Sequence, residues 1–169
     1  MLFDPGGGEA ESRVSGLGLM DSDSRYMNVA LDLARRAAAA GEVPVGCIIV
    51  HQGEIIARSH NSPIALHDPC AHAEILALRQ AGQVRSNYRL VDCDLYVTLE
   101  PCAMCAGALV HARVRRLVFG AADPRAGAAG TVLDVLGSPA ANHRVEVTAG
   151  VEAEACGALL TEFFRQRRK

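Results

Sequence analysis

The sequence predicts one α/β domain in which a mixed sheet is covered by helices on both faces. Three observations support this: the chain has 169 residues, half of them are hydrophobic, and helical periodicities alternate with short apolar runs. Such alternation implies crossover connections and at least partly parallel strands. The expected order is α-β-β-α-β-α-β-α-β-α, which contains five strands.

The domain is expected to begin with a helix and a β-hairpin. Residues 1–22 are rich in glycine, serine and acidic residues, which predicts a disordered extension before a single domain over residues 23–169. Apolar side chains recur at helical spacing over 24–40. The apolar run at 43–50 predicts a buried strand, and the alternation at 54–59 predicts its hairpin partner.

A polar stretch with two prolines, residues 61–69, predicts the loop that follows the hairpin. Asp68 can cap the next helix and Pro69 suits its first turn, with the end expected near Gly82. The remaining elements continue the alternation. They are a strand at 94–99, a helix opened by Pro101 at 102–111, a strand at 115–119, a loop at 120–130, a short helix capped by Thr131 at 131–136, a strand at 145–149 and a closing helix at 152–168.

Composition and charge indicate the cellular compartment, the state of the cysteines and the extent of any contact with RNA. No apolar run reaches the roughly eighteen residues of a membrane helix, and the N-terminus lacks the basic and apolar regions of a signal peptide, so we expect a cytoplasmic protein that is not associated with a membrane. Six cysteines without an export signal favour thiols or metal ligands over disulfides. With a net charge of −2, any contact with RNA must be local.

Two cysteines at the start of a predicted helix indicate a metal site. Cys102 and Cys105 are three residues apart and lie on one face of the helix, whose N-terminus favours the thiolates that zinc binds. His72, at the start of another helix, adds an imidazole. Three protein ligands leave one tetrahedral position for water, which is typical of catalytic zinc. We therefore expect one Zn²⁺ per chain.

Glu74 is the expected proton carrier of this site. It lies about 200° around the helix from His72, which makes it awkward as a ligand but available as a base. Two thiolates and an imidazole cancel the charge of the ion, so the attacking water needs a nearby carboxylate. The alternative is a structural zinc with Cys70 as fourth ligand, in an interaction module or an inactive subunit. Glu74 argues against it, because a structural site has no use for a proton carrier.

His72-Ala73-Glu74 followed by Pro101-Cys102-Ala103-Met104-Cys105 matches the H-x-E…P-C-x-x-C signature of zinc-dependent nucleobase deaminases. The stretches at 42–46, 67–69, 87–90, 127–130 and 142–145 resemble the bacterial tRNA-specific adenosine deaminases, and the resemblance covers about residues 24–168. It implies a three-layer α/β/α cytidine-deaminase-like fold, a homodimer, and hydrolytic deamination of adenosine to inosine at the wobble position of a tRNA anticodon.

The resemblance also implies roles for individual residues. Glu74 would carry protons between the attacking water, N1 of adenine and the departing ammonia. The tRNA anticodon arm is the implied partner, and no organic cofactor is implied. The substrate-binding positions are Asn61 at the flipped nucleoside, Val45 in the pocket wall, Asp123 in a loop near the anticodon, and Phe163, Phe164 and Arg165 near the RNA.

Two alternatives stay open at this point. The zinc signature by itself fits a deaminase of a free nucleobase or nucleotide, such as cytosine, guanine or a pyrimidine nucleotide. By residue type alone, Phe163 and Phe164 are more typical of core or interface residues than of residues that stack on bases, and Arg165 is typical of a solvated helix end. For a dimer, the apolar face of the 102–111 helix and the 131–136 segment are the expected surfaces.

Overall fold

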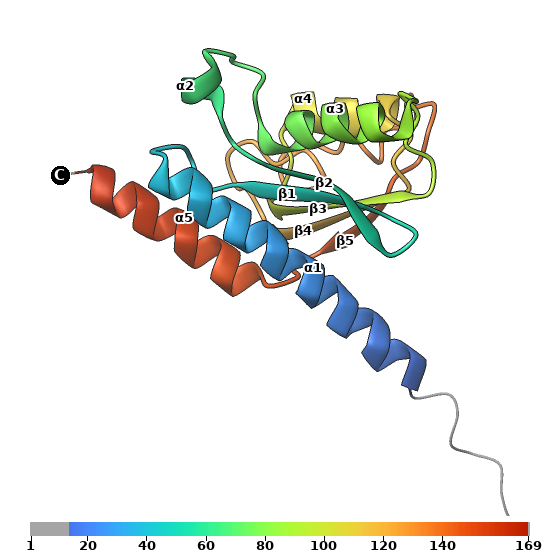
Figure 1. The fold of residues 1–169 in the computed structure, drawn as a ribbon, viewed down its shortest axis with the longest axis horizontal. Coiled ribbons are helices and arrows are strands. Elements are labelled where there is room, and N and C mark those ends of the chain that lie inside the picture. Colours follow the sequence, from blue (N-terminus) through green and yellow to red (C-terminus); the bar gives the residue numbers. More distant parts are fainter. Residues whose placement is uncertain (1–13, 169) are drawn as a thin grey trace, which may run out of the picture.

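The computed structural model describes residues 14–168, with a five-stranded sheet between two layers of helices (Figure 1). The strands lie in the order β2-β1-β3-β4-β5. β1 runs antiparallel to β2 and β3, whereas β3, β4 and β5 are parallel, which confirms the predicted mixed sheet. The elements are α1 Val14–Ala39, β1 Gly46–His51, β2 Glu54–His60, α2 Pro63–Leu66, α3 Ala73–Arg85, β3 Cys93–Leu99, α4 Ala103–His111, β4 Arg116–Ala121, β5 Glu146–Ala149 and α5 Ala153–Arg167.

The sheet separates two hydrophobic cores. α1 and α5 cover one face, and α3 and α4 cover the other (Figure 1). Because side chains alternate between the faces of a strand, neighbouring residues belong to different cores. Ile48 and Tyr96 pack on the α1 side. Ile49, Leu95 and Val97 pack on the α3 and α4 side. This confirms the predicted three-layer α/β/α arrangement.

A glycine lets α1 approach the first strand closely. A Cβ atom added to Gly46 would lie 1.9 Å from the carbonyl oxygen of Ala30. Only glycine allows two backbones to come this near. Gly46 also donates its N–H to Thr98 Oγ1 at 3.1 Å, which links β1 to β3 near the carboxyl end of β3.

Asp23 joins α1 to two strands. Its carboxylate accepts hydrogen bonds from the hydroxyl of Tyr96 at 2.7 Å and from the guanidinium of Arg116 at 2.8 and 3.0 Å. Burial alone would raise the pKa of Asp23, but the hydrogen bonds from Arg116 and Tyr96 lower it below its ordinary value. α1 is therefore held to the strands β3 and β4 by an ionised carboxylate.

Two predicted helix starts are wrong. α1 already begins at Val14 rather than at residue 24, and residues 1–13 of the predicted extension lie outside the described residues. α3 begins at Ala73, so Asp68 and Pro69 do not form its cap and first turn. Asp68 Oδ1 instead accepts the N–H of Cys70 at 2.8 Å within the preceding turn. Part of the predicted loop forms the short helix α2.

The helix predicted at 131–136 is also wrong, since this segment forms turns. The hydroxyl of Thr131, which would have capped the helix, donates to Glu100 instead. The N–H groups of Val132 and Leu133 both donate to the carbonyl of Gly127 at 3.0 Å. A long-range bond to Glu100 and turn bonds to Gly127 thus replace the helical ones. No described helix combines the length and the hydropathy that a membrane span requires.

Candidate active site

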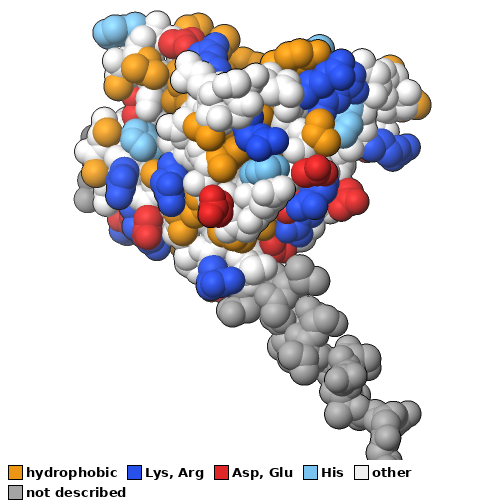
Figure 2. Space-filling model, turned by 45° about the vertical axis from the view of Figure 1, so that its right-hand side comes forward, with side chains coloured by type: hydrophobic (Ala, Val, Ile, Leu, Met, Phe, Trp, Pro, Cys, Tyr) orange, Lys and Arg blue, Asp and Glu red, His pale blue; other side chains and the backbone are white. Residues whose placement is uncertain are grey.

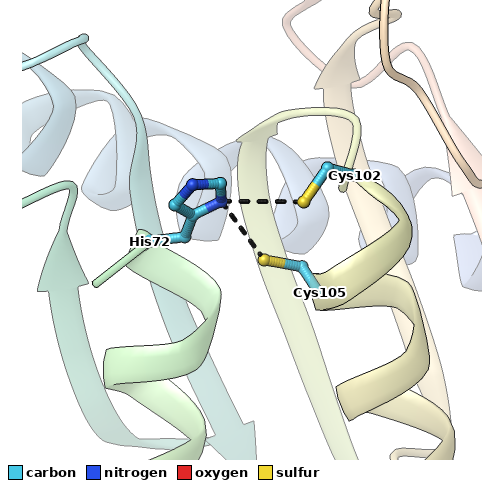
Figure 3. Close-up of side chains that lie close together, drawn as sticks. All are labelled: His72, Cys102 and Cys105. Atoms are coloured by element: carbon cyan, nitrogen blue, oxygen red, sulfur yellow. Dashed lines mark hydrogen bonds between the residues drawn. The ribbon is translucent and has the colours of Figure 1, made fainter. Parts of the chain in front are cut away.

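His72, Cys102 and Cys105 come together at the start of two neighbouring helices (Figure 3). His72 Nδ1 lies 3.7 Å from Cys102 Sγ and 3.5 Å from Cys105 Sγ, and the three ligand atoms lie within 4.8 Å of one another. In a tetrahedral zinc site with the usual bond lengths, nitrogen and sulfur ligands are about 3.6 Å apart. The spacing and the chemistry of these three donors therefore fit zinc.

Both helices begin in a way that leaves the ligand side chains free of capping. His72 and Cys102 are the N-cap residues of α3 and α4, and neither side chain makes a capping hydrogen bond. Cys105 follows in the first turn of α4. At the start of α3, Asn61 Oδ1 accepts the N–H of Ala73 at 2.9 Å. The imidazole of His72 is consequently available for a metal.

Hydrogen bonds among the three donors shift their pKa values in directions that favour metal binding. Hydrogen bonds with Cys105 and His72 lower the pKa of Cys102 to about 3. Hydrogen bonding with Cys102 in turn raises the pKa of both Cys105 and His72. These contacts favour the thiolate form of Cys102, which is the form of cysteine that binds metal ions.

Glu74 lies beside these donors but outside the group of three. It is 4% exposed, and the thiol of Cys105 lowers its pKa, which partly offsets the effect of burial. Burial raises the pKa of Glu74 to about 7. A carboxyl with this pKa can both accept and release a proton near neutral pH.

Cys70 does not join the group. It is exposed, and among the described residues the cluster of possible metal ligands contains only His72, Cys102 and Cys105. The chain therefore offers three ligands here, and the alternative of a closed structural site loses the residue on which it depended.

Val45 and Asn61 adjoin the start of α3. Asn61 follows β2, and its N–H donates to the carbonyl of Val45 at 3.0 Å. Val45 is buried and Asn61 is 9% exposed. Because Asn61 also caps Ala73, one residue after His72, both residues lie close to the cluster. Nearby, the buried Glu42 accepts the N–H of Ala65 at 2.9 Å and so holds α2.

Asp123 lies in the loop that leaves β4. β3 and β4 are parallel neighbours, so the segments after them, which lead to Cys102 and to Asp123, emerge at the same edge of the sheet. Asp123 Oδ1 accepts the N–H groups of Arg125 at 2.9 Å and Ala126 at 3.2 Å. The carboxylate thereby holds a tight turn whose outer residues are exposed.

The three predicted positions in α5 lie on the other side of the sheet from the cluster. Phe163 is buried, and the guanidinium of Arg167 stacks 4.1 Å from the centre of its ring. Phe164 is 44% exposed, and Arg165 is exposed and pairs with Glu162 at 2.7 Å. Arg167 also donates to the carbonyl of Gly41 at 2.7 Å, which fixes the end of α5 near the connection from α1 to β1.

Glu100 is a buried carboxylate whose part in the structure was not predicted. It is 2% exposed and accepts N–H groups from Asp123, Ala129 and Thr131 at 3.0, 3.0 and 3.1 Å. An acidic residue between a buried strand and Pro101 was the available signal. Its partners are more than twenty residues further along the chain, so sequence spacing alone could not identify them.

Residues 20–121 match the family described as the cytidine and deoxycytidylate deaminase zinc-binding region. The chain belongs to this deaminase family. The match includes all three members of the cluster and Glu74, so the family and the donor set both identify zinc as the metal that His72, Cys102 and Cys105 would hold.

Within this family, the chain is similar to individual tRNA-specific adenosine deaminases. The chain is 47% identical over 150 residues to the tRNA-specific adenosine deaminase of Bacillus subtilis, covering 89% of this chain and 93% of that protein. It is 49% identical over 148 residues to the enzyme of the same name from Haemophilus influenzae, covering 87% and 86%. The family resemblance seen in the sequence is thereby confirmed.

Solved structures of deaminases have a fold similar to that of this chain. A structure from work on A-to-I editing by tRNA:A34 deaminases at the wobble position of transfer RNA superposes with a TM-score of 0.79 and 42% identity, covering 81% of this chain and 99% of that one. The guanine deaminase of Nitrosomonas europaea gives a TM-score of 0.72 and 28% identity, covering 83% of each chain. Both structures support the deaminase fold.

Proposed function

We propose that the protein hydrolytically deaminates adenosine to inosine at the wobble position of a tRNA anticodon. The observation that carries the proposal is the buried Glu74 beside a three-ligand cluster in the fold of a deaminase. The tRNA substrate is supported by the identity of 47–49% with tRNA-specific adenosine deaminases over most of both chains. A cytoplasmic location is part of this proposal, and it is supported by the similarity to tRNA-specific deaminases.

The residues of the site divide the chemistry among them. His72, Cys102 and Cys105 would hold zinc, which would lower the pKa of a water molecule so that, once deprotonated, it can attack C6 of adenine. Glu74 accepts one proton of that water and delivers it to N1, and it then transfers the proton of the new C6 hydroxyl to the amino group as the C–N bond breaks and ammonia leaves. Its burial keeps bulk water away from the proton it carries.

Asn61 and Val45 form the proposed nucleoside pocket. Asn61 Oδ1 accepts the N–H of Ala73, and its Nδ2 is the proposed donor to the nucleoside. Val45, joined to Asn61 through the backbone, presents an apolar side chain to the base. A wobble base must leave its stack to enter such a pocket.

RNA binding relies on local contacts in this proposal. On the face shown in Figure 2, basic side chains are interspersed with acidic and apolar ones rather than gathered into one basic area. The turn after Asp123 and the exposed Phe164 and Arg165 near the end of α5 are the proposed contacts with the anticodon arm. Arg165 would exchange Glu162 for a phosphate.

A free nucleobase is the second candidate substrate, and the similarity to a guanine deaminase favours it. The deciding experiment incubates the zinc-loaded protein with an anticodon stem-loop that carries adenosine at the wobble position, and detects inosine by mass spectrometry of the digested RNA. Free guanine, cytosine and adenosine are assayed in parallel. We expect inosine in the RNA alone. Deamination of a free base without deamination of the RNA would replace the proposal with the second candidate.

A homodimer is part of the proposal. The face formed by α3 and α4 has an apolar hollow lined by Ile75, Leu78 and Ala108, and the neighbouring Tyr88 is 71% exposed. A second copy of the chain would cover these side chains. Sedimentation equilibrium should give twice the chain mass, and Leu78→Arg should give the mass of one chain. A wild-type protein that sediments as a monomer would contradict this assembly.

A further inference from the structure

The carboxylate of Glu100 is a single attachment point for the loop at 122–131. Its Oε1 accepts the N–H groups of Ala129 and Thr131, and its Oε2 accepts the N–H of Asp123 and the hydroxyl of Thr131. Four hydrogen bonds satisfy both oxygens of a buried charge, which makes each bond strong and its loss costly. The two ends of the loop are thus tied to one side chain.

The middle of the loop packs against the same carboxylate. A Cβ atom on Gly127 would lie 2.4 Å from Glu100 Oε2, so the contact requires glycine here. The next residue, Ala128, donates its N–H to the carbonyl of Pro101 at 2.8 Å. The loop is therefore seated directly on the segment that leads into Cys102.

The part of the loop that is not held by Glu100 faces outwards. Pro124, Arg125 and Ala126 are exposed, while Gly127 and Ala128 are buried. The turn at 123–126 is closed by Asp123 Oδ1, and its orientation depends on the bond between the Asp123 N–H and Glu100. A shift of that one bond would move the whole exposed turn.

We propose that Glu100 is a positioning residue that fixes the exposed turn at 123–126 for contact with the RNA, without taking part in zinc binding or in proton transfer. The inference rests on the proposed tRNA substrate. It extends that proposal, because it assigns the RNA-facing geometry of the loop to a buried side chain that does not itself reach the substrate.

The substitution Glu100→Gln tests this assignment. Glutamine can keep the N–H groups of Ala129 and Thr131 on its carbonyl oxygen, but its amide then faces the N–H of Asp123 and that bond is lost, whereas the Thr131 hydroxyl can turn and accept from the amide. We expect the KM for the anticodon stem-loop to rise about fivefold or more, because uniform binding of the RNA is weakened. The kcat should stay within about twofold, and zinc should stay at about one per chain.

Gly127→Ala presses on the same contact from the side of the loop, since the added Cβ would lie 2.4 Å from Glu100 Oε2 and 2.6 Å from the carbonyl oxygen of Asp123, and its backbone angle permits alanine. It should also raise the KM with little change in kcat. If both variants act through one contact, the double variant should raise the KM by clearly less than the product of the two single effects. Independent, multiplicative effects would overturn the proposal.

Glu42→Gln is the matched control. Glu42 is equally buried, and it accepts one backbone N–H, that of Ala65 in α2, which a glutamine oxygen can still accept. Its KM should stay within about twofold of wild type. An unchanged KM for Glu100→Gln, or an equal rise for Glu42→Gln, would overturn the inference. If the wild-type protein does not deaminate the stem-loop at all, the proposed function has failed, which is a separate result.

Discussion

Asn61 caps the helix of the zinc ligand His72, with its Oδ1 accepting the N–H of Ala73 at 2.9 Å. The oxygen stabilises the start of α3, and the nitrogen of the same amide is the proposed donor to the nucleoside. Because the two functions use different atoms, substitutions can separate them.

Asn61→Asp keeps an oxygen for Ala73 and removes the amide donor. We expect a Tm close to wild type and a kcat/KM at least about tenfold lower, since a buried hydrogen bond to the substrate is lost. Asn61→Ala removes both, and should also lower the stability by about 1 kcal/mol. Thermal unfolding and RNA deamination are the measurements. Full activity in Asn61→Asp would show that the amide does not contact the nucleoside.

Cys105→Ser should remove the bound zinc, because a buried hydroxyl is a much weaker ligand than a thiolate. Cys70→Ser is its control. It changes a cysteine two residues before His72 that lies outside the cluster, so zinc should stay at about one per chain. The zinc content of both variants, measured by atomic emission, tests these two expectations. Loss of zinc in Cys70→Ser would make Cys70 a fourth ligand and revive the structural site.

Glu74→Gln preserves the size of the side chain and abolishes its ability to accept a proton. We expect zinc and fold to be retained and kcat to fall by about a thousandfold or more, the range expected when one residue serves as both base and acid. Single-turnover deamination of the stem-loop measures the chemical step. A loss of less than about tenfold would assign the proton transfer to another group.

The ion pair of Asp23 and Arg116 predicts how stability depends on pH. The pKa of Asp23 in the folded protein is lower than its ordinary value of 3.8, so its stabilising effect is complete above that pH and is lost as the pH falls through the folded pKa. Asp23→Asn should cost about 2 kcal/mol near neutral pH. Urea unfolding at several pH values should show that the difference from wild type shrinks below about pH 4. A difference that stays constant to pH 2 would contradict this.

Local patterns were sufficient for the strands and for the metal ligands. The sheet follows from short apolar runs, and the spacing of Cys102 and Cys105 places two donors on one helix. Contacts between distant residues decided the rest. α3 starts at Ala73 because Asn61, twelve residues earlier, supplies its cap. No helix forms at 131–136 because the Thr131 hydroxyl is bound by Glu100, thirty-one residues earlier.

The hydrogen bonds between Glu100 and its loop leave the exposed turn of that loop free to vary in sequence. Pro124, Arg125 and Ala126 are exposed and make none of the four bonds to the carboxylate. Mutations there can accumulate without disturbing the buried attachment or the adjacent Cys102. New recognition surfaces can therefore evolve on an unchanged reaction centre, provided that the contact between Glu100 and Gly127 still anchors each variant turn.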